Sequence, residues 1–191
     1  MNKIIYMILF LLPLQMLYPA KGGITYRSVS ISYLNIYGRT NVNSFEFFLP
    51  NTQEEFARQH IDIDTSPART MNLSFPVRKL KTENEAMYDD FLELLREKEY
   101  PEIAIGIDNT PLLESQEDFQ TIEPVISIRM AGVTRRYKIR CEVEKNTFGK
   151  YIKGMVKIKL TDFNLEPPSK FLGLIKVRDE VRINFAILFS T

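Results

Sequence analysis

The side chains that most often carry enzyme chemistry are scarce in this sequence. The chain of 191 residues has one histidine, His60, and one cysteine, Cys141. A Ser–His–Asp or Cys–His arrangement would have a single candidate base, and no nucleophile motif surrounds any serine. Histidine and cysteine together supply only two zinc ligands. We therefore expect no enzymatic activity, no metal and no cofactor, and interpret His60 as a loop histidine and Cys141 as a small buried hydrophobe.

The charged residues favour neither glycoside hydrolysis nor nucleic-acid binding. Asp62 and Asp64 alternate with isoleucines, which is typical of the solvated face of a short strand, and nothing in the sequence positions a catalytic carboxylate pair. Lys and Arg number 25 against 24 Asp and Glu, so the formal net charge is +1. Such a balance gives no excess positive charge to hold a polyanion, and we expect no nucleic-acid partner.

Three polar side chains fall in phase with apolar neighbours in strand-like segments. Arg135 alternates in step with Tyr137, and Asp179 is in step with Val177 and Val181. A charge on the apolar face of a strand must be paired or lie at a wet rim. Two interpretations stay open: rim residues that end their strands in water, or a polar gate that holds a ligand headgroup, with Tyr137 as the first residue inside.

The elements that must position these residues are mostly strands. Apolar residues alternate with polar ones in many segments, which indicates strands with one apolar and one polar face. Pro124 interrupts one segment just before a Gly132 turn, and Pro167 and Pro168 interrupt another. The alternating sets are Val29–Tyr33, Phe45–Leu49, Met71–Val77, Ile103–Ile107, Ile126–Met130, Val133–Val143, Ile152–Leu160 and Val181–Phe189.

One segment has helical rather than alternating spacing. Met87, Phe91, Leu94 and Leu95 share one face, and Thr82 with a glutamate three residues later forms a capping-box pattern. We predict one amphipathic helix across an end or face of a sheet. About eight antiparallel strands with one helix indicate a single barrel or sandwich, whose interior is either filled by side chains or holds one small ligand.

The N-terminus has the anatomy of a secretory signal peptide. A short region with Lys3 precedes an apolar stretch of about 14 residues from Ile4 to Leu17, and small residues follow at Ala20 and Gly22. The stretch is too short to span a bilayer comfortably. We predict a signal peptide over residues 1–22, a mature domain over residues 23–191, and a periplasmic or secreted location; an uncleaved anchor is the alternative.

Three stretches in order resemble the YceI-like, polyisoprenoid-binding family. They are "ENEAMYDDFLELLREKEYPEIAIG", "MAGVTRRYKIRCEV" and "VKIKLTDFNLEPPSKFLGLIKVRDEVRINFAILF", and "GRTNVNSFEF" is similar to that family's first hairpin. The resemblance implies an extended, mainly β, lipocalin-like antiparallel barrel. It also implies an exported protein without catalytic role, whose apolar pocket holds an isoprenoid or other long-chain amphiphile.

With that pocket, the predicted ligand-binding residues are those of the apolar phase and of the proline-rich turn. At this turn the strand ends at Phe163 and apolar sequence resumes at Phe171, so we expect both rings to line or cover a barrel end. The set is Phe45, Phe47, Leu73, Phe75, Ile105, Ile128, Arg135, Tyr137, Ile139, Ile158, Phe163, Phe171, Asp179 and Phe185. Two functions stay open: a carrier or scavenger of an amphiphile, or a ligand-free structural module of the cell envelope with a filled core. The sequence also leaves a homodimer open.

A membrane contact follows from one predicted hairpin. Residues 133–144 and 151–160 flank a short loop with Gly149, which predicts antiparallel pairing with Glu144 opposite Tyr151 and Glu142 opposite Lys153. The same register pairs Lys138–Lys157, Arg136–Lys159, Val143–Ile152, Ile139–Val156 and Tyr137–Ile158. The four cations would then form either a solvated face or a stripe that docks transiently on an anionic membrane surface.

Overall fold

The computed structural model describes most of the chain beyond residue 27. The described residues are 28–50, 60–63, 71–108, 119–147, 149–170, 172 and 174–190. The predicted signal peptide over residues 1–22 and its cleavage point lie outside these ranges.

The described residues are mainly strands. The strands are β1 (Ser28–Arg39), β2 (Ser44–Phe48), β3 (His60–Ile63), β4 (Met71–Pro76), β5 (Glu102–Asp108), β6 (Phe119–Ile122), β7 (Val125–Met130), β8 (Val133–Lys138), β9 (Cys141–Asn146), β10 (Gly149–Lys159), β11 (Ser169–Lys170), β12 (Ile175–Lys176) and β13 (Glu180–Ser190). The helix α2 (Glu85–Leu94) and two short 3-10 helices, η1 (Val77–Lys79) and η2 (Leu160–Phe163), complete the described elements.

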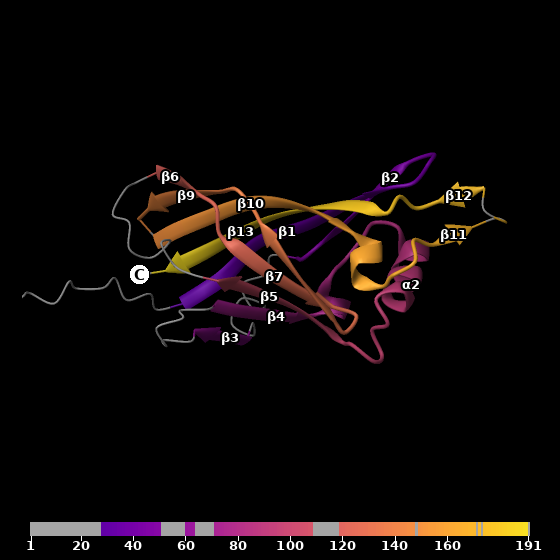
Figure 1. Cartoon of the computed structure of the whole chain (residues 1–191), viewed down its shortest axis with the longest axis horizontal. Helices are drawn as coiled ribbons and strands as arrows, with labels where there is room; N and C mark the ends of the chain where they lie inside the picture. Colours follow the sequence, from indigo (N-terminus) through magenta and orange to yellow (C-terminus); the bar gives the residue numbers. More distant parts are fainter. Residues whose placement is uncertain are drawn as a thin grey trace, which may run out of the picture.

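Two antiparallel sheets face each other across one hydrophobic core (Figure 1). In the described part of the chain, one sheet has the order β2-β1-β13-β10-β9-β6 and the other the order β3-β4-β5-β7-β8, while β11 and β12 form a small hairpin. The prediction of a mainly β, antiparallel fold with one helix is confirmed. The prediction of a closed, lipocalin-like barrel of about eight strands is wrong, because among the described strands no ladder of hydrogen bonds joins the two sheets into a cylinder.

A bent ribbon of two chain segments passes from one sheet to the other. The chain passes through Glu123-Pro124 between β6 and β7, and through Ile139-Arg140 between β8 and β9. Since β6 pairs with β9 in the larger sheet and β7 pairs with β8 in the smaller one, both strands of the ribbon change sheets at the same level. Pro124 has no N–H to continue a ladder, and its carbonyl accepts the N–H of Ile139 at 3.1 Å. The predicted interruption at Pro124 is therefore confirmed as a corner.

The predicted hairpin is right near its turn. Glu144 lies opposite Tyr151 and Glu142 lies opposite Lys153, and this pairing continues as far as Gly154. The Lys153 ammonium bonds the carboxylate of Glu144 diagonally, at 2.6 Å. The turn chemistry and the alternation thus determine the register over the first six residue pairs.

Beyond Gly154 the predicted pairing is wrong because of the corner. β8 pairs with β7 in the other sheet, so that Arg136 lies opposite Ser127 and Lys138 lies opposite Val125. The pairs that do not form are Lys138–Lys157, Arg136–Lys159, Ile139–Val156 and Tyr137–Ile158. The four cations lie on two different sheets, so the stripe predicted to dock on a membrane does not exist.

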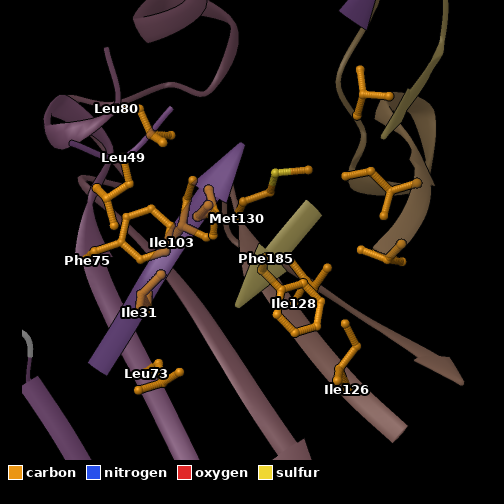
Figure 2. Packing of buried hydrophobic residues seen from close by; sticks show 14 of the residues in the cluster. Ile31, Leu49, Leu73, Phe75, Leu80, Ile103, Ile126, Ile128, Met130 and Phe185 are labelled. Atoms are coloured by element: carbon orange, nitrogen blue, oxygen red, sulfur yellow. The ribbon is translucent and has the colours of Figure 1, made fainter. Parts of the chain in front are cut away.

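The space between the sheets is filled by the predicted apolar phase (Figure 2). Leu73 and Phe75 are 1% and 2% exposed and pack from the smaller sheet against residues such as Ile31 of the larger one. A β-bulge between Ile31 and Tyr33 shifts the phase of β1, so that Leu34 is buried and Tyr33 is 40% exposed. Only about 50 Å³ remains open in this core.

The helix α2 confirms the predicted amphipathic segment and closes one end of the space between the sheets (Figure 1). Its N-cap is Asn84, and the N–H of Asn84 bonds the hydroxyl of Thr82 at 3.3 Å. The predicted capping box does not form, because the helix begins two residues later than the box requires. The ring of Phe91 stacks on that of Phe47 at 4.0 Å between centroids, which fixes α2 against β2.

Candidate functional site

A cavity of about 440 Å³ lies at the α2 end of the molecule, where the helix, the ends of both sheets and the segment from Pro168 to Val177 meet. This volume falls in the range of about 300–1,000 Å³ that is usual for small-molecule sites. The cavity is lined by Ile36, Thr40, Asn43, Phe45, Phe47, Asn84, Met87, Asp90, Phe91, Leu94, Leu95, Ile103, Met130, Ile158, Leu160, Pro168, Ile175, Val177, Val181 and Ile183. Its walls are almost wholly apolar, so it suits an apolar chain.

Local sequence explains each apolar wall. Along α2, Met87, Phe91 and Leu94 recur at the helical period and face the cavity. Along β2, Phe45 and a second phenylalanine two residues later share one face of the strand. The ring of Phe45 lies over Gly38, where a Cβ atom would come within 2.1 Å of its Cζ atom. Glycine at this position is therefore what lets the Phe45 ring form part of the wall.

Polar groups gather at one side of the cavity, around the β1–β2 turn. The hydroxyl of Thr40 donates to Oδ1 of Asn43 at 2.6 Å and accepts the N–H of Asn43 at 2.9 Å. Asn84 and Asp90 of the helix also line the cavity. The Thr40 hydrogen bonds hold the turn in place, so this side of the cavity is fixed by hydrogen bonding rather than by apolar packing.

A polar groove of about 820 Å³ adjoins the cavity. The two share Asn43, Phe45, Asn84 and Met87 as common wall residues. The charged residues of the groove are Arg39, Glu46, Glu83, Lys157, Arg178, Glu180 and Arg182. An amphiphile with its tail in the cavity could therefore place its head in this groove without crossing the core.

The groove has more positive charge than its carboxylates neutralise. Glu180 pairs with Lys157 at 3.4 Å. The guanidinium of Arg182 stacks over the ring of Tyr37 at 5.0 Å. Within the described ranges, no carboxylate forms an ion pair with Arg39 or Arg178. These two arginines favour an anionic or hydrogen-bond-accepting head.

The predicted site residues separate into three groups. Phe45, Phe47 and Ile158 line the end cavity. A second group surrounds the narrow gap inside the filled core: Leu73, Phe75, Ile105, Ile128 and Phe185. The third group, Arg135, Tyr137, Ile139, Phe163 and Asp179, lines neither space. Phe171 lies outside the described residues.

Members of the third group make contacts that support the fold. Phe163 is fully buried, and its ring lies at 6.4 Å from that of Tyr137, which closes the side of the core between β8 and η2. Burial, reinforced by the carboxylate of Asp162, raises the pKa of Tyr137 to about 12. Arg135 is exposed, and Ile139 is buried at the corner of the ribbon.

Asp179 caps a turn. Its carboxylate accepts the N–H of Thr161 at 2.9 Å and the hydroxyl of Thr161 at 2.7 Å, at the start of η2. Burial opposes ionisation, but the hydrogen bonds from Thr161, the charge of Lys159 and the backbone of Leu160 together lower the pKa of Asp179. The interaction fixes η2, and through it Leu160, at the cavity wall.

Sequence reasoning missed most of the helix and hairpin wall. Met87, Phe91, Leu94 and Leu95 were predicted to share an apolar helix face, and that signal could have assigned them to a site at the sheet end. The residues from the segment after η2, such as Ile175 of the two-residue strand β12, had no such signal, because so short a strand has no periodicity. Val177 is held by a bridge to Thr40, a contact between distant parts of the sequence.

The described residues offer no conventional catalytic centre. Within those ranges no group of His, Cys, Asp and Glu is arranged to hold a metal ion. Cys141 is buried, and burial raises the pKa of its thiol to about 12. Among the described helices, none combines the length and apolar character of a membrane-spanning segment. The walls of the cavity thus carry few reactive groups.

The family assignment follows from a comparison that covers most of the chain. A family model described as the YceI-like domain matches residues 23–189. The chain belongs to the YceI-like family. No curated protein matches it in sequence.

Solved structures share this YceI-like fold at low sequence identity. A polyisoprenoid-binding domain from Saccharophagus degradans has a TM-score of 0.68 at 12% identity, over 85% of this chain and 98% of that one. BcnA of Burkholderia cenocepacia has a TM-score of 0.61 at 15% identity, over 83% and 96%. A Campylobacter jejuni YceI protein has a TM-score of 0.52 at 16% identity, over 70% and 80%. At such identities the likeness shows the fold.

Proposed function

We propose that this YceI-like chain binds a long-chain, isoprenoid-like amphiphile and carries or sequesters it, without catalysis. The observation that carries the proposal is the apolar cavity of about 440 Å³ at the α2 end, which shares four wall residues with a polar groove. The family supports it, since one structural neighbour is described as a polyisoprenoid-binding domain.

The energetics favour a tail without specific polar contacts. Each methylene moved from water into an apolar space contributes about 0.8 kcal/mol, so a chain of several isoprene units needs no hydrogen bond to bind tightly. The head would lie in the groove beside Arg39 and Arg178, rather than at the gate of Arg135 and Asp179 that the sequence suggested. The cavity would thus select ligands by the length and apolarity of their tails, and the groove would select them by their heads.

We also propose that the protein acts outside the cytoplasm, in the periplasm or secreted, with residues 1–22 removed as a signal peptide. The short apolar stretch followed by small residues supports this. The intact mass of protein purified from the envelope fraction measures the cleavage directly. A homodimer stays a prediction.

The test is to extract the purified protein with organic solvent and identify co-purifying lipids by mass spectrometry. Replacement Leu94→Trp places a large ring in the cavity wall, and we expect the lipid yield to fall several-fold. The matched control is Phe119→Trp, because Phe119 is 61% exposed on β6, far from the cavity. No lipid in the parent protein, together with no uptake of added geranylgeraniol, would contradict the proposal.

The filled space between the sheets favours a second candidate, a ligand-free structural or interaction module of the envelope. Only about 50 Å³ remains open there, bounded by residues such as Phe75 and Ile128. Under this function, Leu94→Trp would change stability alone. The lipid extraction distinguishes the two.

A further inference from the structure

Three exposed apolar side chains lie together on adjoining turns at the cavity end. Leu172 is fully exposed, at 108% of its reference area, Leu174 is 74% exposed, and Val42 is 66% exposed. Leu172 and Leu174 belong to the turn between β11 and β12, and Val42 to the turn between β1 and β2; both hairpins project from the same end of the molecule (Figure 1). Side chains this exposed bury little apolar surface, and a group of them on one surface is typical of an interaction site.

Hydrogen bonds join the two turns into one platform. The side-chain amide of Asn41 donates to the carbonyl of Leu174 at 2.8 Å, and its Oδ1 accepts the N–H of Lys176 at 2.9 Å. The N–H of Asn41 also donates to the carbonyl of Lys176 at 3.1 Å. The apolar side chains are therefore presented by a fixed surface, which we call the leucine tip: Val42, Leu172 and Leu174.

Positive charge lies directly behind the leucine tip. Arg39, Lys176 and Arg178 are exposed, and the N–H of Arg178 donates to the carbonyl of Arg39 at 2.8 Å. An apolar tip with cations behind it matches a bilayer with anionic headgroups, since the leucines reach the acyl boundary while the cations stay at the headgroups. Lys176 lies in β12, two residues after Leu174, so one tip leucine and one of the cations are close together in the chain.

The leucine tip also adjoins the mouth of the cavity. Pro168, Ile175 and Val177 flank the β11–β12 turn and line the apolar cavity. If Leu172 and Leu174 entered a bilayer, residues of the cavity wall would follow only a few positions away in the chain. An amphiphile could then pass between membrane and cavity with little exposure to water.

We propose that the leucine tip inserts into the headgroup region of an anionic bilayer and docks the cavity mouth on it. This surface differs from the predicted four-cation stripe, which does not form because its cations lie on two different sheets. The insertion rests on the exposed leucines and cations alone; the transfer of an amphiphile rests on the proposed function.

Flotation with vesicles tests the insertion. Processed wild-type protein is mixed with vesicles of phosphatidylcholine, with and without phosphatidylglycerol, and compared with Leu172→Asp/Leu174→Asp. Leu172 has φ 55, a conformation that aspartate tolerates better than leucine, so this variant should fold. We expect wild type to bind the anionic vesicles and the tip variant to bind at least about tenfold more weakly.

The matched control is Phe119→Asp/Met155→Asp, which removes two exposed apolar side chains, 61% and 46% exposed, from outside the leucine tip. We expect this variant to bind within about twofold of wild type. Equal loss in both variants, or full binding by the tip variant, would overturn the proposal, as would wild type that fails to bind anionic vesicles.

A local probe keeps the result independent of any other membrane-binding segment. Leu172→Cys carrying an environment-sensitive dye should shift its emission to the blue on anionic vesicles, while Phe119→Cys with the same dye should not. Cys141 is buried and its thiol stays protonated, so it should not take the dye. An unshifted dye at position 172 overturns insertion.

Lipid extraction of the tip variant separates this proposal from the proposed function. If the tip variant keeps its lipid but loses vesicle binding, both stand. If the parent protein holds no lipid and takes up no added geranylgeraniol, yet the dye at position 172 shifts, insertion stands and the carrier function fails.

Discussion

The space between the two sheets and the cavity at the α2 end are built from the same kind of residue but differ in how well they are filled. Both are lined by Ile36, Ile103, Met130 and Ile183, yet the first leaves about 50 Å³ open and the second about 440 Å³. Between the sheets, aromatic and β-branched side chains interdigitate from both sides (Figure 2). Apolar alternation therefore predicts an interior but not whether that interior is full.

The difference comes from what forms the second wall. At the α2 end a helix and a hairpin replace one sheet, and they are held in place by contacts with the neighbouring elements. Thr40 and Asn41 fix the turns by hydrogen bonds, and Phe91 stacks on Phe47 at one edge. These supports hold the walls apart, so the side chains need not meet across the space. A cavity can persist where the surrounding frame is stable without its contents.

The largest expected effect on stability comes from truncating one leucine in each region. Leu73→Ala removes a side chain that is 1% exposed from the filled core, and we expect the free energy of unfolding to fall by about 2–5 kcal/mol. Leu94→Ala removes a half-buried side chain from the cavity wall, and because it enlarges a space that is already open, its cost should lie near or below the bottom of that range. Urea denaturation measures both, and equal losses would remove the distinction between the two regions.

A smaller loss of stability is expected when a side chain is enlarged than when it is truncated. Ile128→Phe overpacks the core and should cost about 1–3 kcal/mol, whereas Ile158→Phe can extend its ring into the cavity and should cost less. The lipid yield should follow the opposite order, with the larger loss for Ile158→Phe. Thermal unfolding and lipid extraction of the same two samples check the pair, and a larger stability loss for Ile158→Phe would contradict the comparison.

Alkaline pH should lower the stability of the protein through two buried groups of the core. Near neutral pH this effect is negligible. Burial raises the pKa of Cys141 from 9.0 to about 12, and burial with Asp162 raises that of Tyr137 from 10.0 to about 12. The folded state holds these protons more tightly than the unfolded state, so their contribution to stability is constant below about pH 9 and declines as the pH rises towards 12.

Denaturation at a series of alkaline pH values measures this decline, and Cys141→Ala should shift its onset upward towards the unfolded pKa of Tyr137. If stability rises above pH 9, or if Cys141→Ala leaves the profile unchanged, the buried thiol does not contribute in this way.

The sequence predicted the interior faces well but the pairing only in part. Ile103 and Ile107 are buried as their alternation predicts, and Glu144 lies opposite Tyr151 as the turn predicts. An alternating pattern shows which side chains face the interior but not which strand lies alongside. At Pro124 the alternation continues while the pairing partners change from one sheet to the other. The bulge after Ile31 shifts the phase without any residue that marks it.

The candidate site was predictable only where a single element carries it. Phe45 and Phe47 follow from alternation along β2, and Met87 and Phe91 could have followed from the helix face. The open volume depends on how far elements from distant parts of the chain stand from one another, and no local pattern records that distance. The leucine tip had a partial signal in the apolar residues after Pro168, but exposure rather than apolarity decides its role.

The place of β13 has a consequence for the order in which the protein is assembled. β13 lies between β1 and β10 in the larger sheet, so its closest partners include the first described strand (Figure 1). A growing chain can form the hairpin of β1 with β2 and that of β9 with β10, but these halves stay apart, with unpaired edges, until residues 180–190 are synthesised. The nascent chain therefore lacks a complete core for almost the whole of its synthesis. Trimming within β13 would yield two separated half-sheets prone to aggregation rather than a slightly shorter protein.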